Sequence, residues 1–158
     1  MTRLGIALTV VVGLAGVMRP APVSAEDDAA SVTGAAEAVF SNGATLGGLT
    51  LNALDLGQGL FIALDGSAVG QFHAVLHGTS LLGQQQNVIV EGKVTNGSAD
   101  GSGGATFSGT ATVNMGDGTP PVPDIPFAAT VSTTSLALVL NATSLPAATL
   151  TAGSITIE

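Results

Sequence analysis

A strict alternation of apolar and polar side chains is the feature that most limits how this chain can fold. It is clearest in residues 106–115, where apolar or small residues occupy every second position. One set is Phe107, Gly109, Ala111, Val113 and Met115, and the other is Thr106, Ser108, Thr110, Thr112 and Asn114. A period of two places successive side chains on opposite faces of a β-strand. The pattern predicts strands with one buried face here and at 68–76, 88–94 and 125–131.

Five further strands are predicted, at 31–40, 46–56, 59–64, 135–142 and 148–157. Turn residues that tolerate positive φ punctuate the chain: Ser41-Asn42-Gly43, Asp65-Gly66, Asn96-Gly97, Asp100-Gly101 and Asp117-Gly118. Strands joined by such short turns pair antiparallel. We therefore expect an all-β fold, an antiparallel β-sandwich of about eight or nine strands. A closed β-barrel is the alternative, because strand number and alternation fit both.

Three segments depart from simple alternation. Leu60 to Leu64 is apolar without a break, which predicts a strand covered on both faces. The proline-rich stretch from Thr119 to Pro126 cannot donate a regular hydrogen-bond ladder, so we expect it to cross between sheets or around a barrel edge. The apolar positions change parity at Ala152-Gly153, as a β-bulge would cause.

Glycines recur on the predicted inward faces, as at Gly34, Gly92 and Gly109. A glycine inside a strand allows a bend or the close approach of a neighbouring side chain. The alternative is that these glycines leave room for a ligand.

The first 25 residues have the three parts of a secretory signal peptide. Arg3 precedes an apolar run over residues 4–17, and Val23-Ser24-Ala25 supplies small residues for cleavage after Ala25. A membrane anchor would need about 20 apolar residues, which is longer than this run. The mature chain, residues 26–158, is expected to be a single β-domain with no transmembrane segment.

The composition of the mature chain excludes several classes of partner. Lys93 is its single basic residue against eleven acidic ones, which gives a formal charge of −10. A nucleic-acid binder needs Lys and Arg to displace phosphate counterions, and an anionic membrane surface would repel this chain. The chain has no cysteine, so its stability comes from packing and strand pairing. Without Trp or Tyr there is no aromatic platform, and the five phenylalanines are expected in the core.

Two polar groupings are weak candidates for metal binding. His73 and His77 are four apart, but along a strand that spacing spans about 13 Å, too far for one ion. Asn96, Ser98 and Asp100 imitate the first half of a calcium loop, yet Phe107 stands where the bidentate glutamate would be needed. We therefore expect no metal and no cofactor.

No recognisable catalytic motif is present. There is no cysteine nucleophile and no serine in a Gly-x-Ser-x-Gly elbow. Asp55 and Asp65 could in principle serve as an acid and a base, but the aromatics that normally shape a sugar subsite are missing. An enzyme would require His73 or His77 to meet an acid and a hydroxyl in a cleft, and we do not expect such a cluster.

The stretch from Leu64 to Val75 combines an acidic turn, glycine, an aromatic residue and an alternating strand. In this order it resembles WxL-type domains, secreted β-domains that associate with the cell wall of Gram-positive bacteria. The Trp-x-Leu motifs of that family are absent. The resemblance implies a place in the cell envelope and no particular binding residue.

Two hypotheses for function follow. The first is a secreted, non-catalytic structural protein of the extracellular space or cell envelope that associates with itself. Its Thr, Ser, Ala and Gly faces lack the lysines that usually block pairing between sheet edges. The alternative is a carrier that holds a small apolar ligand inside a barrel or sandwich, where inward glycines leave room.

Overall fold

The computed structural model describes residues 29–158, so the predicted signal peptide lies outside it. Within the described part there are nine strands: β1 (Ala30–Leu46), β2 (Leu49–Ile62), β3 (Ser67–Thr79), β4 (Gln85–Ala99), β5 (Gly104–Asn114), β6 (Val122–Ser132), β7 (Ser135–Leu140), β8 (Thr143–Ser144) and β9 (Ala148–Ile157). All pairings are antiparallel, which confirms the all-β prediction. Over the same residues, no helix has the length and apolar character needed to cross a membrane.

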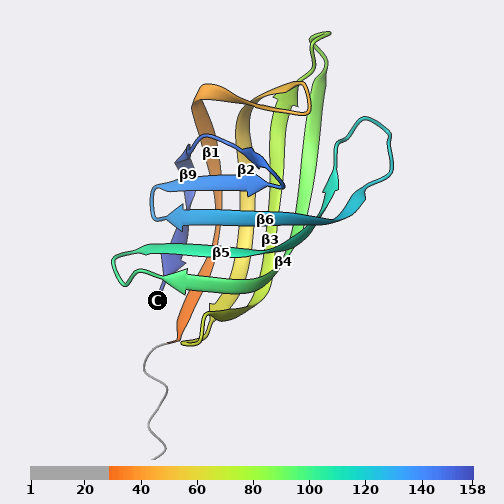
Figure 1. The fold of residues 1–158 in the computed structure, drawn as a ribbon. Coiled ribbons are helices and arrows are strands. Elements are labelled where there is room, and N and C mark those ends of the chain that lie inside the picture. The colour runs from red at the N-terminus through yellow and green to blue at the C-terminus, as the bar shows by residue number, and fades with distance from the viewer. Residues whose placement is uncertain (1–28) are drawn as a thin grey trace, which may run out of the picture.

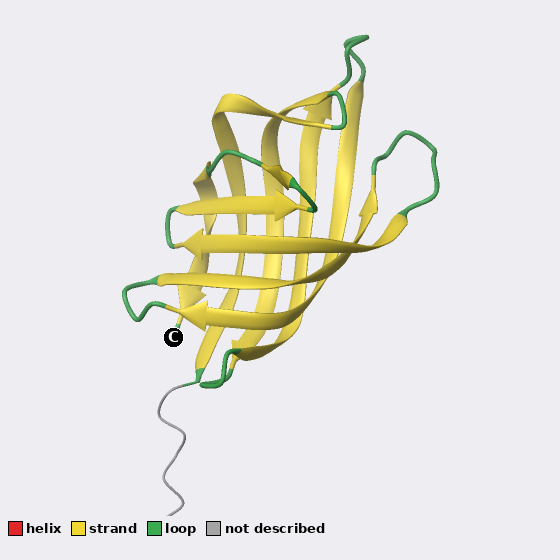
Figure 2. Ribbon diagram, viewed as in Figure 1, coloured by secondary structure: helices red, strands yellow, loops and turns green. Residues whose placement is uncertain are grey.

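The nine strands form one sheet that closes on itself. Strands β1 to β6 pair in sequence order, β1 also pairs with β9, and β6 pairs with β7. The ring is completed where β7 meets β9 through two residue pairs, Ser135 with Thr149 and Leu136 with Ala148. Strands β5 and β6 run across the upright strands β1 to β4 in the view of Figure 1, so one continuous sheet supplies two layers (Figure 2).

The core between the layers is built from the faces that alternation predicted. Val88, Val90 and Val94 point inward from β4, and every second residue of β5 does the same. At the centre, the Phe72 ring stacks on Phe127 with a centroid distance of 5.5 Å. Phe107 lies 5.7 Å from Phe72 and 6.4 Å from Phe127. Four of the five phenylalanines are buried, and Phe61 is the exception with 48% of its surface exposed.

Gly92 allows the three rings to pack closely. A Cβ added there would lie 2.8 Å from Cε1 and Cζ of Phe127. That distance is well inside the range of about 3.5–4.0 Å at which carbon atoms pack. At this position the glycine serves the close approach of a side chain, and Phe127 occupies the space that a ligand would need.

The first predicted turn is wrong. Ser41-Asn42-Gly43 lies inside β1, where the register with β2 shifts between Val39 and Ala44. The chain reverses at Gly47-Gly48, whose φ values of 56° and 84° suit a two-residue hairpin turn and place Leu46 opposite Leu49. Strand β2 then runs without the predicted break near residues 57–58, because Gly57 and Gly59 keep the alternation intact.

Three other local predictions are also wrong. Asn96-Gly97 lies within β4 at an irregularity and makes no reversal. The proline-rich stretch is not a crossing, because β6 begins at Val122 and Pro126 pairs with Thr110 of β5. The prolines are accommodated where this pairing shifts register, with Asp124 at a φ of 58°. Leu60 to Leu64 is not covered on both faces, since Leu64 is 65% exposed.

Three predicted turns and the predicted bulge are confirmed. The chain turns at Asp65-Gly66, Asp100-Gly101 and Asp117-Gly118. In β9, the predicted bulge is present: Ala152 pairs with Glu37 and Leu150 with Ala38, which leaves Thr151 as the extra residue.

Candidate functional site

Both histidines lie on the outer face of β3, as the alternation predicted. His73 stands between Gly57 of β2 and Glu91 of β4, and His77 stands between Ala53 and Asn87. They are four residues apart along this strand, a spacing of about 13 Å. Among residues 29–158 there is no group of three or more His, Asp or Glu side chains arranged to hold a metal.

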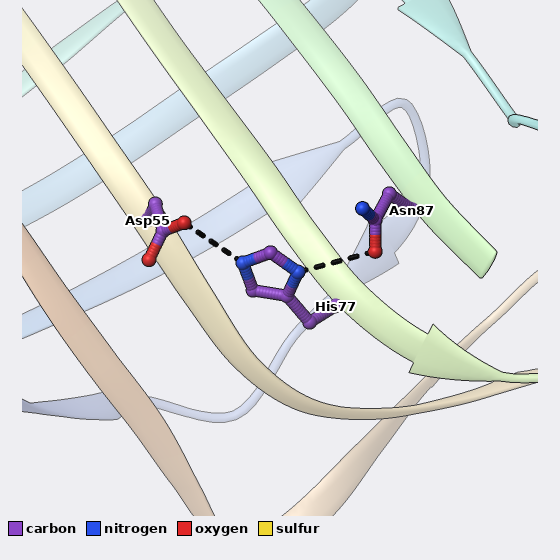
Figure 3. Close-up of polar contacts among 3 residues, drawn as sticks. All are labelled: Asp55, His77 and Asn87. Carbon is purple, nitrogen blue, oxygen red and sulfur yellow. Dashed lines mark hydrogen bonds and ion pairs between the residues drawn. The ribbon is translucent and has the colours of Figure 1, made fainter. Parts of the chain in front are cut away.

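His77 is the centre of a polar contact that joins three strands (Figure 3). Its Nε2 atom lies 2.8 Å from Oδ2 of Asp55 on β2, and its Nδ1 atom lies 3.1 Å from Oδ1 of Asn87 on β4. Asp55 is directly opposite Glu37 of β1, so two carboxylates face each other across neighbouring strands. Like charges in that position destabilise a sheet, and a protonated His77 offsets them.

The contacts of His77 favour its charged form. Both ring nitrogens face oxygen acceptors, and only an imidazolium can donate a hydrogen bond from each. The pKa of His77 is raised, chiefly by the hydrogen bond to Asp55 against a smaller opposing effect of burial. The bond to Asn87 and the negative charges of Asp55 and Glu37 raise this pKa further.

The same contacts limit what the His77 cluster can do chemically. A general base needs a free ring nitrogen within reach of the group it deprotonates. Here both nitrogens are engaged, so the arrangement of Asp55, His77 and Asn87 fastens β2, β3 and β4 to one another. Asp65, the other carboxylate considered as an acid or base, lies in the β2–β3 turn and does not join Asp55.

The acidic residues of the turns act within their own loops. Asp65 accepts hydrogen bonds from the backbone N–H and hydroxyl of Ser67 at 2.9 and 2.6 Å, and these lower its pKa. Asp100, the third residue of the calcium-like grouping, accepts from the backbone N–H groups of Ser102 and Gly104, which lower its pKa. The Asp100 carboxylate thus stabilises a glycine-rich hairpin tip, as the sequence suggested.

His73 borders a shallow depression on the outer face of β3 and β4. It has a volume of about 560 Å³, and its rim carries the polar side chains of Gln71, His73, Glu91 and Lys93. Lys93 is the single basic residue among residues 29–158, and here it lies two residues from Glu91 on the same face. Val69, Phe72 and two glycines complete the lining, so apolar groups are present, but the depression is open to solvent and differs from the enclosed pockets that hold small molecules.

One side chain in the core was missed by the sequence reasoning. Gln58 points inward from β2 with only 9% of its surface exposed, and it lies opposite Gly34 and Phe72. Neither its amide oxygen nor its amide nitrogen has a hydrogen-bond partner in the described part of the chain. An unpaired buried amide lowers stability by about 1–3 kcal/mol.

The closed ring leaves part of β9 without a second partner strand among residues 29–158. Strand β9 stands beside β1 at the border of the upright layer (Figure 1). Strand β7 reaches only Ala148 and Thr149 of β9, so from Thr151 to Ile157 its second edge has no partner strand among residues 29–158. This seven-residue stretch contains no charged residue and no proline. We call it the β9 edge.

Comparison of the chain with family models, with curated proteins and with solved structures gave no match. The class of protein is therefore inferred from its own residues and their geometry.

Proposed function

We propose that the mature chain is a secreted, non-catalytic structural protein of the extracellular space or cell envelope that pairs with itself through the β9 edge. The observation that carries this proposal is the unpaired, uncharged stretch from Thr151 to Ile157. A free strand edge presents N–H and C=O groups to any strand that can lie beside it.

The chain lacks the usual protection of such an edge. Natural sheets block free edges with lysine, proline or inward charges. The bulge at Thr151 bends only the start of the β9 edge, which leaves Ser154 to Ile157 as its straight part. Beside the straight part the outer face is also free of charge, because Ser154 is followed across the sheet by Ala35 and Gly57, whereas Glu37 lies beside Ala152 at the bulge.

The geometry of the contact fixes the expected assembly. Two copies that pair β9 with β9 antiparallel use the same edge on each copy, so the contact closes on a two-fold axis as a dimer. Each copy carries a formal charge of −10 after signal cleavage, so the bodies repel each other. Because salt screens that repulsion, the dimer should be favoured as ionic strength rises.

The test is the assembly state of the mature protein over a wide range of concentration, measured by sedimentation velocity and native mass spectrometry. Ser154→Lys places a charge on the first residue of the straight part, in the middle of the stretch from Thr151 to Ile157, and should weaken the dimer at least about tenfold. Thr130→Lys is the matched control, because Thr130 is exposed on β6, which is paired on both sides. A strictly monomeric protein with no affinity for envelope material would end the proposal. A monomer with additional bound mass would favour the ligand carrier instead.

A further inference from the structure

The turn between β3 and β4 exposes two adjacent leucines. Leu81 and Leu82 have 91% and 86% of their surface exposed, more than any other large apolar side chain in the described residues. The turn stands at the far end of the β3–β4 hairpin, which extends past the neighbouring strands at the top of Figures 1 and 2. The most solvent-exposed apolar groups therefore lie on a projection and not on a face.

The turn is held firmly by its own hydrogen bonds. The Ser80 N–H donates to the Gln84 carbonyl at 2.8 Å, and the Gly83 N–H donates to the Ser80 carbonyl at 2.9 Å. The Ser80 hydroxyl accepts from the Gln84 N–H at 3.2 Å. At the base, the Gln86 side chain donates to the Met115 carbonyl at 2.7 Å. These bonds close the turn and hold the two leucines at its tip.

The surroundings of the leucines are polar but uncharged. No Asp, Glu, Lys or Arg occurs from Gly78 to Val90 in an otherwise acidic chain. Three consecutive glutamines, at positions 84–86, follow the turn on the β4 side. The projection thus has two apolar side chains at its tip and uncharged glutamine amides beneath them, and it carries no charge of its own.

We propose that Leu81 and Leu82 form a lipid-contact tip that inserts reversibly into the interface of an uncharged lipid layer. A fluid layer accepts a convex apolar tip without a preformed pocket. Recognition by a protein partner relies mainly on Trp, Tyr and Arg anchors, and the tip has none. A second copy offers an apolar depression beside Phe61 and Leu64, but the Asp65 carboxylate is part of its lining and makes it a poor receptor for the tip.

The net charge of the whole chain determines which lipids the tip should prefer. With a formal charge of −10, the mature protein is repelled by an anionic surface, so insertion should be strongest into phosphatidylcholine. Two leucines bury less apolar area than a myristoyl chain, which by itself binds only marginally. The tip therefore gives weak, reversible contact that does not anchor the protein permanently.

The absence of tryptophan from the chain allows a direct test. Leu82→Trp in the mature protein gives a single fluorophore at the tip, and Leu64→Trp gives the matched control at the other end of β3. With phosphatidylcholine vesicles, the Leu82→Trp emission should shift to the blue and be quenched by lipids brominated in their acyl chains. The control should show neither effect. In vesicle flotation of the otherwise unaltered mature chain, Leu81→Ser should lower partitioning about tenfold.

Four outcomes would overturn the proposal: no shift of Leu82→Trp at saturating lipid, equal shifts in both tryptophan variants, stronger binding to anionic vesicles, or a lipid-independent shift that grows with protein concentration. The last would assign the tip to a contact between copies. Far-UV circular dichroism identical to wild type confirms that each variant is folded.

Discussion

The close packing of Gly92 against Phe127 makes a specific prediction about stability. In Gly92→Ala, the new methyl group would lie 2.8 Å from two carbons of the Phe127 ring. The ring has little freedom to retreat, because it stacks on Phe72 at 5.5 Å and meets Phe107 at 6.4 Å. Overpacking of this kind destabilises by about 1–3 kcal/mol. The reduced freedom of the unfolded chain returns about 0.4–1 kcal/mol, so we expect a net loss of about 1–2 kcal/mol.

Gly57→Ala is the matched control for this substitution. Gly57 is also a strand glycine, but a Cβ added there meets no atom within 4 Å and its φ is not positive. Only the effect on the unfolded chain should remain, so Gly57→Ala should be neutral or stabilising by up to about 1 kcal/mol. The two variants exchange the same atoms, and their difference isolates the contact with Phe127.

Urea unfolding followed by far-UV circular dichroism measures these free energies, since the chain has no Trp or Tyr for fluorescence. Phe127→Leu removes part of the ring that the new methyl group would strike. Combined with Gly92→Ala, it should destabilise less than the sum of the two single changes by about 1 kcal/mol. Equal stabilities for Gly92→Ala and Gly57→Ala would show that the space beside Gly92 is open. That result would refute the filled core and favour an interior with room for a ligand.

Three further predictions concern polar groups. Gln58→Met should raise the free energy of unfolding by about 1–3 kcal/mol, because it removes an unpaired buried amide at nearly constant volume; a loss of stability would show that the amide has a partner. The pKa of His77 is raised on folding, so its contribution is fully present below about pH 6.5 and is lost as the pH rises through the folded-state pKa. In urea titrations at pH 5.5, the free energy of unfolding of His77→Gln should therefore be lower than that of wild type by less than about 1 kcal/mol, since both side chains of the ion pair are partly exposed. At high pH the two proteins should be equally stable, and an equal deficit at both pH values would contradict the ion pair. Asp100→Asn should lower the free energy of unfolding at pH 7, because the Asp100 carboxylate is stabilised when ionised. The difference from wild type should shrink as the pH falls through the lowered pKa of Asp100; a difference that does not change as the pH is lowered would exclude this cause.

The sequence predicted the strands and their buried faces well because alternation is a local property. Phe107, Ala111 and Val113 share a face whatever strand lies beside them. Turns were predicted less well, because Ser41-Asn42-Gly43 and Gly47-Gly48 compete for the same reversal. The choice depends on which register buries Leu49 and Leu51, and that information lies in the partner strand.

The candidate sites depended on topology that no local pattern contains. His77 and Asp55 are 22 residues apart in sequence, and they meet only because β2 and β3 pair in one particular register. The β9 edge exists because the pairing of β7 with β9 ends at Thr149. That end point depends on how all the strands of the ring are placed. Leu81-Leu82 before Gly83 did offer a signal: two adjacent large apolar residues in a turn between predicted strands have no face on which to be buried.

Sedimentation velocity of the mature protein over increasing concentration and salt is the direct measurement of pairing through the β9 edge. We expect a monomer–dimer equilibrium for wild type that strengthens with salt, is retained in Thr130→Lys and is weakened at least about tenfold in Ser154→Lys. A wild-type protein that remains monomeric under all of these conditions, or a dimer that Ser154→Lys leaves unchanged, would contradict pairing through the β9 edge.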